Sequence, residues 1–159
     1  MKSSSDPLTF RQATRNMADA AVLTDPSGHI TWANKAFERL CGYSDKEIAN
    51  QKPGDLLQGK ETNPETVQKI HQAIATKSHV CVEILNYHKD GHSYWASIAI
   101  SPIKNKLHEL EGFIAIERDI TEKNFELSCL KSEISQMYQV LIHQEQRLCT
   151  SNEDALETE

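Results

Sequence analysis

The chain has 159 residues and a formal net charge of -6, and its 17 lysines and arginines are scattered along the sequence. A chain of this length can hold one globular domain with its own core plus an extension. Because no basic helix or arginine-rich stretch is present, we expect no direct binding to nucleic acid.

The N-terminus and the cysteines bear on the cellular compartment. The first ten residues, MKSSSDPLTF, lack the apolar run of a signal peptide, and no stretch approaches the ~18 to 20 apolar residues that span a bilayer. Cys41, Cys81, Cys129 and Cys149 are far apart and form no CxxC pair. This spacing favours reduced thiols over disulfides or a zinc site. We therefore expect a cytoplasmic protein with no membrane segment and no metal.

The first part of the chain predicts a hairpin followed by short helices. Residues 21–25 (AVLTD) and 29–34 (HITWAN) have strand-like patterns on either side of a Pro-Ser-Gly turn. Residues 34–59 contain helical patches interrupted by glycine and proline, and Ser44 is placed to cap the DKEI turn. Short helices and loops are therefore expected after the hairpin.

The middle of the chain predicts one longer helix and three strands. Residues 62–77 begin with capping residues and a proline, and the apolar side chains that follow recur at helical spacing. Residues 80–91, 92–103 and 111–120 each alternate with period two and are separated by turn signals. This order of elements indicates an α+β domain, in which helices cover one face of an antiparallel sheet.

The C-terminal part changes in composition after residue 120. Apolar residues recur there at spacings of three, four and seven, which is the a/d pattern of a coiled coil. These residues are Leu127, Leu130, Ile134, Met137, Leu141 and Leu148. About three heptads favour a parallel homodimer. The polar and acidic end, residues 150–159, is expected to be disordered.

Several segments together resemble the PAS superfamily of sensory domains. They read DPSGHITWANKAFERLCGYSDKEI, LLQGKETNPETVQKIHQAI, EILNYHKDGHSYWASIAISPI and GFIAIERDITE. The resemblance implies a five-stranded antiparallel sheet with helices on one face. It also implies a layout with a flanking segment at 1–20, a sensor domain at 21–119, a coiled-coil signalling helix at 120–149 and a tail at 150–159.

Within that superfamily the chain resembles the light-oxygen-voltage (LOV) branch and the flavin-binding redox sensors. The resemblance lies in LQGKETNPETV, EILNYHKDG and the Tyr-Trp pair of the fourth strand. LOV domains carry a photoactive cysteine in an Asn-Cys-Arg run, and this chain has Pro53, Gly54 and Asp55 there. Asp55 replaces an arginine that clamps the flavin phosphate, and His71 matches a second one. The resemblance thus implies a flavin, FAD or FMN, without a light-driven cysteine adduct.

Strand alternation assigns the face that the helices cover. On the last three strands this face carries Val82, Ile84, Asn86, Tyr94, Ala96, Ile98, Ile100, Phe113, Ala115 and Glu117. Asn86 and Glu117 are polar groups on this apolar wall, and each costs about 1 to 3 kcal/mol if it is buried without a partner. A flat heteroaromatic ligand with donors and acceptors along its edge would satisfy them. The candidate cofactor-binding residues are Asn86, Gln58, Glu117, Asn34, Trp32, Ala96 and His71.

Three functional hypotheses follow from these residues. The first is a flavin-binding sensor that relays redox or light state through a dimeric helix to an output domain or a kinase- or cyclase-type effector. The second is a cofactor-free dimerisation module, in which Asn86 and Glu117 pair with each other or lie at a wetter strand end. The third is a haem-based gas sensor that uses His71. The sequence contains no nucleophile-base pair or phosphate loop, so we expect no enzymatic activity.

Overall fold

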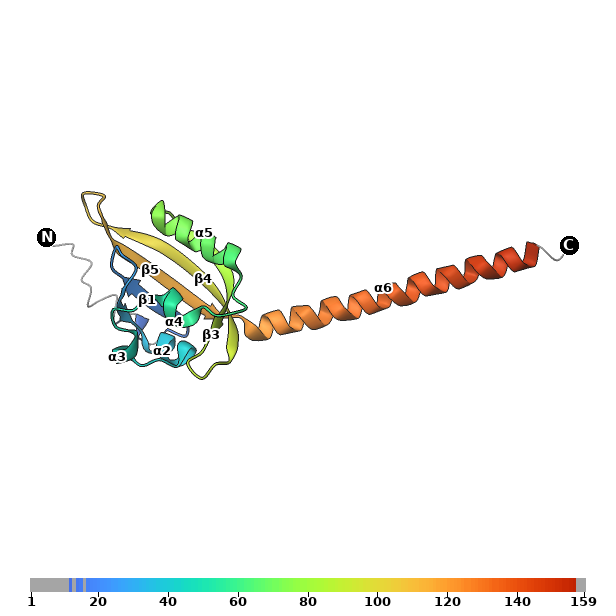
Figure 1. The fold of residues 1–159 in the computed structure, drawn as a ribbon, viewed down its shortest axis with the longest axis horizontal. Coiled ribbons are helices and arrows are strands. Elements are labelled where there is room, and N and C mark those ends of the chain that lie inside the picture. Colours follow the sequence, from blue (N-terminus) through green and yellow to red (C-terminus); the bar gives the residue numbers. More distant parts are fainter. Residues whose placement is uncertain (1–11, 13, 16, 157–159) are drawn as a thin grey trace. The chain divides into compact units, whose positions relative to one another are not determined.

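The computed structural model describes the backbone of residues 12, 14, 15 and 17–156 and the side chains of these residues up to 143. The chain divides into two compact units, with the boundary between Thr121 and Glu122. The first unit contains a five-stranded sheet in the order β2-β1-β5-β4-β3 (Figure 1). Every strand pairs with its neighbours in the antiparallel sense.

The strands lie close to the ranges that the alternation predicts. Their bounds are Ala20–Thr24 for β1, Ile30–Ala33 for β2, Val80–Tyr87 for β3, Ser93–Lys104 for β4 and Leu110–Asp119 for β5. β5 is the central strand, because β1 pairs with one of its edges and β4 with the other. The helix-covered face predicted from the last three strands is confirmed, since its members are buried or partly buried.

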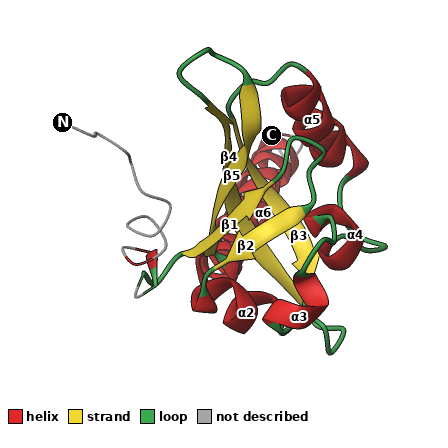
Figure 2. Ribbon diagram, turned by 90° about the vertical axis from the view of Figure 1, so that its left-hand side faces the viewer, coloured by secondary structure: helices red, strands yellow, loops and turns green. Residues whose placement is uncertain are grey.

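Four helices cover this face of the sheet. They are α2 (Lys35–Cys41), α3 (Asp45–Ile48), α4 (Pro53–Leu57) and α5 (Pro64–Ala75). Figure 2 shows α4 and α5 beside β3. The predicted Ser44 cap is present, because the Ser44 backbone N–H and hydroxyl both donate to the Glu47 carboxylate, at 2.9 and 2.8 Å. Asn63 caps α5 by accepting from the Glu65 backbone N–H.

Asn34 fastens the hairpin to α2 and to the segment before β1. Its side-chain oxygen accepts from the backbone N–H groups of Ala21 and Phe37, each at 3.0 Å. Its amide nitrogen donates to the carbonyls of Thr14 and Asp19, at 3.0 and 3.1 Å. The side chain is only 2% exposed, so these four bonds satisfy an amide that water cannot reach.

The second unit is a single helix, α6 (Thr121–Leu156). The predicted coiled-coil residues with described side chains are exposed in the single chain, from 43% for Leu127 to 66% for Met137. The helix continues to Leu156, so the disordered tail expected from residue 150 is not seen over 150–156. Within 150–156, Glu153, Ala155 and Leu156 have good helix propensity. Residues 157–159 lie outside the described residues.

No helix within the described part of the chain is long and apolar enough to cross a bilayer.

The role of Asn34 can be tested by comparing two helix caps. We expect Asn34→Ala to lower the free energy of unfolding by about 2 to 3 kcal/mol, because buried backbone groups lose their partners. Asn63→Ala should cost about 1 kcal/mol or less, because its cap is exposed and water can replace it. Urea denaturation followed by circular dichroism measures both values. Equal losses in the two variants would contradict the anchoring role of Asn34.

Candidate functional site

A cavity of about 300 Å³ lies between the helix-covered face of the sheet and the helices α4 and α5. Its volume falls at the lower end of the range for ligand sites. Its apolar wall consists of Leu57, Ile70, Ile74, Ile84, Ile98, Ile100, Phe113 and Ala115. Three polar side chains among the predicted candidates, Gln58, Asn86 and Glu117, line the same cavity. An apolar hollow with a few convergent polar groups has the typical make-up of a site for a small organic ligand.

Glu117 is the most unusual group in this cavity. It lies on the central strand β5, opposite Ala20 on one side and Ile98 on the other. The side chain is 2% exposed, and its Oε2 atom has no hydrogen-bond partner among the described residues. Burial raises the pKa of Glu117 from 4.5 to about 7. The carboxyl can therefore gain or lose a proton near neutral pH.

Asn86 is too far along the sheet to satisfy Glu117 by itself. The two residues lie on β3 and β5 with β4 between them, and their partners on β4, Tyr94 and Ile98, are themselves several residues apart. Two strand spacings across the sheet and this offset along it place their backbones about 16 Å apart. Asn86 is 2% exposed and lies opposite Tyr94 on β4. The Tyr94 hydroxyl makes no hydrogen bond of acceptable geometry in the described part of the chain. Burial, and then the nearby Glu117 carboxyl, raise the pKa of Tyr94. The Asn86 amide lies near enough to the Tyr94 hydroxyl to offset part of this rise.

The opening of the cavity carries charged and polar groups. Lys52 and Asp55 come from the start of α4, and His71 comes from α5; all three are exposed and line the cavity. Lys52 was not among the candidate residues predicted from the sequence. The signal for it in the sequence was its position directly before the Pro-Gly-Asp run, in which Asp55 replaces the phosphate-binding arginine of the family that the chain resembles. Gly54 also lines the cavity, and no cysteine is among the described residues that do so.

The structure brings four of the predicted candidates together and places the other three elsewhere. Gln58, Asn86, Glu117 and His71 line the cavity. Ala96 is completely buried in the core beside it. Trp32 lies in β2 and borders a different surface hollow, near Lys35 and Asp45. Asn34 uses all its hydrogen-bonding groups on the backbone, so no donor or acceptor remains for a ligand.

None of the described thiols lines the cavity. Cys41 is buried in the core. Burial, with a smaller contribution from the Glu117 carboxyl, raises the pKa of the Cys41 thiol to about 11, so it stays protonated. Cys81 and Cys129 are exposed.

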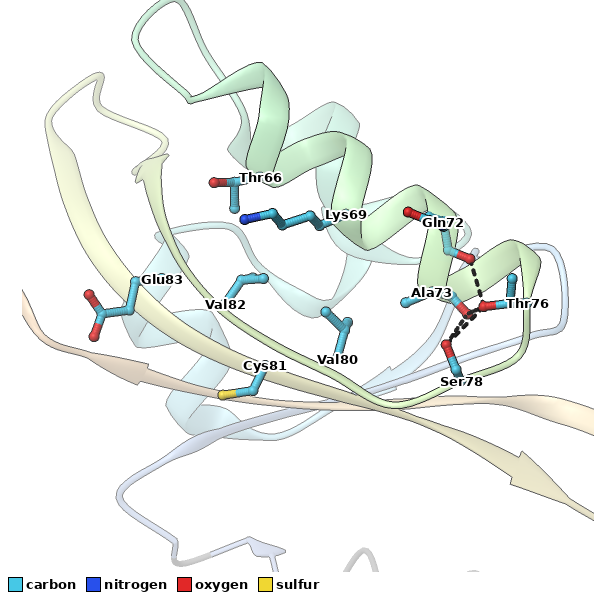
Figure 3. A pocket seen from close by; sticks show the side chains of 10 residues that line it. All are labelled: Thr66, Lys69, Gln72, Ala73, Thr76, Ser78, Val80, Cys81, Val82 and Glu83. Atoms are coloured by element: carbon cyan, nitrogen blue, oxygen red, sulfur yellow. Dashed lines mark hydrogen bonds between the residues drawn. The ribbon is translucent and has the colours of Figure 1, made fainter.

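A second, larger hollow of about 540 Å³ lies between α5 and β3. Figure 3 shows its lining: Thr66, Lys69, Gln72, Ala73, Thr76, Ser78, Val80, Cys81, Val82 and Glu83. Half of these side chains are polar and exposed, and Thr76 and Ser78 are hydrogen-bonded to each other at 2.8 Å. This open groove at the sheet edge holds no buried polar group that lacks a partner, among the described residues. The smaller cavity is therefore the better candidate for a ligand site.

Comparison with known proteins agrees with this fold. Residues 18–122 match the family model described as a PAS domain. The chain is 40% identical over 96 residues to a blue-light-activated histidine kinase of Brucella anthropi, an alignment that covers 60% of the chain and 19% of the kinase. It is 35% identical over 115 residues to phototropin-1B of Oryza sativa subsp. japonica, covering 72% of the chain and 12% of the phototropin. The chain thus spans less than a fifth of the length of either relative.

Two solved structures share the architecture. One is described as an RNA-binding light-oxygen-voltage receptor and superposes with a TM-score of 0.71 at 28% identity, covering 83% of this chain and 39% of the receptor. The other is a light-oxygen-voltage domain studied with a flavin analogue. It has a TM-score of 0.68 at 24% identity and covers 84% of this chain and 99% of the domain, which supports the fold alone. The chain belongs to the PAS domain family, and its structural neighbours are light-oxygen-voltage domains.

Proposed function

We propose that this chain is a cytoplasmic sensory module that binds a flavin, FAD or FMN, non-covalently. Its state would pass through a dimeric C-terminal helix to an output domain or an effector of the kinase or cyclase type. The observation that carries the proposal is Glu117, a buried carboxyl that faces an apolar cavity and has one oxygen with no partner in the described part of the chain. Such a group is costly unless a ligand satisfies it.

The cavity fits the edge of a flavin in its chemistry. The side-chain amides of Asn86 and Gln58 offer both donors and acceptors, and the protonated form of Glu117 adds a donor. At the opening, Lys52 is a cation that would hold a phosphate group in place of the missing arginine. The relatives named as blue-light-activated kinases support a chromophore in this position. Gly54 occupies the cavity where the resemblance has a nucleophilic cysteine, which supports redox change over formation of a cysteine adduct.

A flavin supplies electron transfer coupled to proton uptake at its ring. The residues of this chain would respond through Glu117, which is poised to exchange a proton near neutral pH. A change in the protonation of Glu117 would alter which groups it donates to or accepts from. Glu117 lies on the central strand β5, two residues before the strand ends at Asp119.

The end of β5 is tied to the start of α6. The Asp119 carboxylate accepts from the backbone N–H and the hydroxyl of Thr121, at 2.9 and 2.6 Å. The Thr121 hydroxyl in turn accepts from the Trp95 backbone N–H at 2.9 Å, and Ile120 donates to the Trp95 carbonyl at 2.8 Å. A shift along β5 would therefore reach the first residue of α6. A preference of about 1 to 3 kcal/mol for one arrangement is enough for regulation.

The two alternatives have weaker support. The cofactor-free module with an Asn86–Glu117 pair is disfavoured by the strand between these residues. The haem-based sensor needs a buried ligand to the iron, and His71 is exposed at the cavity opening.

The flavin proposal is tested by absorption spectroscopy of the purified chain after it has been offered riboflavin, FMN and FAD. We expect a two-band flavin spectrum that dithionite bleaches, and chromatography of the released cofactor distinguishes FAD from FMN. Asn86→Leu keeps the volume but removes the amide, so flavin affinity should fall at least about tenfold, the loss of one buried hydrogen bond to the ring.

Trp32→Phe is the control for this experiment, because Trp32 lies outside the cavity; its affinity should not change. A colourless protein that takes up no flavin and remains dimeric would support the dimerisation module instead.

The protonation of Glu117 is tested without any ligand. Because the folded pKa of about 7 exceeds the unfolded value of 4.5, the folded state binds more protons between these values, and stability falls as pH rises through this window. Below pH 4.5 Glu117 is protonated in both the folded and the unfolded state, so it does not lower the free energy of unfolding. Above pH 7 burial of the charged carboxylate lowers the free energy of unfolding by on the order of 3 kcal/mol. Glu117→Gln should therefore be more stable than the wild type at pH 8.

The difference between Glu117→Gln and the wild type should vanish near pH 4. Urea denaturation across this pH range measures it. A constant difference at every pH would show that Glu117 does not titrate in this window.

The dimer is tested by placing charges on the apolar seam of α6. The double variant Ile134→Asp/Leu141→Asp should be monomeric in sedimentation experiments, because two buried carboxylates would face their copies across the coil. The matched control Val140→Asp/Ile142→Asp changes residues of the same kind outside the a/d positions and should remain dimeric. A dimer that survives the seam variant would place the interface elsewhere.

A further inference from the structure

The hairpin between β3 and β4 brings two histidines and an aspartate together. His88, Asp90 and His92 each offer a ligand atom, and these atoms lie within 4.8 Å of one another. Asp90 Oδ1 is 3.0 Å from Nδ1 of His88 and 2.5 Å from Nδ1 of His92. The two imidazole rings are stacked, with centroids 4.5 Å apart. The cluster lies outside the cavity described above and takes no part in the proposed function.

The backbone holds these side chains in place. His88 N–H donates to the His92 carbonyl at 2.8 Å, and Gly91 N–H donates to the His88 carbonyl at 2.9 Å. Gly91 has φ of 97°, a conformation that suits glycine and allows the tight turn. The hairpin is also tied to the core, because Lys89 N–H donates to the Cys41 carbonyl at 2.9 Å.

The ring of His88 is fixed by its neighbour Gly42. A β-carbon at Gly42 would lie 2.3 Å from the His88 ring, so the glycine leaves the space that the imidazole fills. His88 is accordingly the least exposed of the three, at 22%, against 62% for Asp90 and 60% for His92. One ligand is thus held rigidly, and the other two are reached from solvent.

The charges around the cluster favour a cation. Lys89, which stands between the first two ligands in sequence, has its ammonium group paired with Glu47 at 2.5 Å and positioned over the Tyr43 ring. It therefore does not repel a cation at the cluster. The Asp90 carboxylate lies within hydrogen-bonding distance of both imidazoles.

We propose that His88, Asp90 and His92 form a surface site for a divalent transition-metal ion such as Zn²⁺, with the remaining coordination position open to water. Two imidazoles and one carboxylate are a ligand set that such ions accept. Bond lengths of about 2.0 to 2.1 Å in a tetrahedral site put the ligand atoms about 3.3 Å apart. The two Asp90–histidine separations lie near this value. Because an ion must lie in the plane of each ligating imidazole, the stacked rings have to turn apart, and the exposed His92 ring is the one that we expect to rotate. A bound ion would join the end of β3 to the start of β4.

The site is tested by isothermal titration calorimetry with Zn²⁺ on the untagged, chelator-treated chain. Cys81, Cys129 and Cys149 are replaced by serine throughout, so that thiols do not bind the metal. We expect one equivalent of Zn²⁺ to bind. His88→Ala, Asp90→Asn and His92→Ala should each weaken binding at least about tenfold, as expected when one of three ligands is lost. His79→Ala is the matched control, since His79 is exposed and contacts Ser101 instead.

Nuclear magnetic resonance gives an independent readout. Zn²⁺ should shift the Nδ1 resonances of His88 and His92, and leave that of His79 unchanged. The proposal is overturned if the parent chain binds no equivalent of Zn²⁺, or if the three ligand variants bind it as tightly as the His79→Ala control. Because Asp90 and His92 are mostly exposed, Asp90→Asn and His92→Ala should fold like the parent, which circular dichroism checks.

Discussion

Burial of a carboxyl group on the central strand is the constraint on which the cavity depends. The strand β5 is hydrogen-bonded on both edges, so the backbone at Glu117 cannot move away from the core without breaking two ladders. Its side chain must therefore remain on the helix-covered face among Ile98, Ala115 and the other apolar groups of the wall. Burial raises the pKa of this carboxyl to about 7, and one of its oxygens has no hydrogen-bond partner among the residues that the structure describes. The ligand proposal and the pH dependence of stability both arise from this single placement.

The same strand also connects the cavity to the helix that leaves the domain. Alternation places Glu117 on the inner face and Arg118 on the outer face, where Arg118 makes an exposed ion pair with Asp19. Asp119 then caps the first residue of α6. Thr121, the first residue of α6, is hydrogen-bonded both to Asp119 and to the Trp95 backbone. This hydrogen-bonded connection suits a module whose proposed output depends on how α6 pairs with a second copy.

Much of the fold could be predicted from the sequence because it rests on local signals. Period-two alternation predicts β3, β4 and β5 and their buried faces. Capping residues predict where two helices begin: Ser44 for α3, and Thr62 or Asn63 for α5, of which the structure uses Asn63. The prediction that Asn86 and Glu117 stand on an apolar wall follows from the same alternation. The end of α6 was harder to predict, since a polar, acidic segment with good helix formers is compatible with both a tail and a helix.

The sequence by itself determined the strands, their inner faces and the two polar residues on the apolar wall, because side-chain alternation needs no knowledge of distant residues. Tertiary structure alone decided which polar groups are already satisfied. The sequence predicted Asn34 as a ligand contact, but its side chain is hydrogen-bonded to backbone groups of Thr14, Asp19 and Ala21. These partners are 13 to 20 residues away in sequence, so no local pattern indicates them. It likewise placed Lys52 at the cavity opening and Trp32 away from it. Hydrogen-bond partners and cavity walls come from segments far apart in the chain, so only the packed fold specifies them.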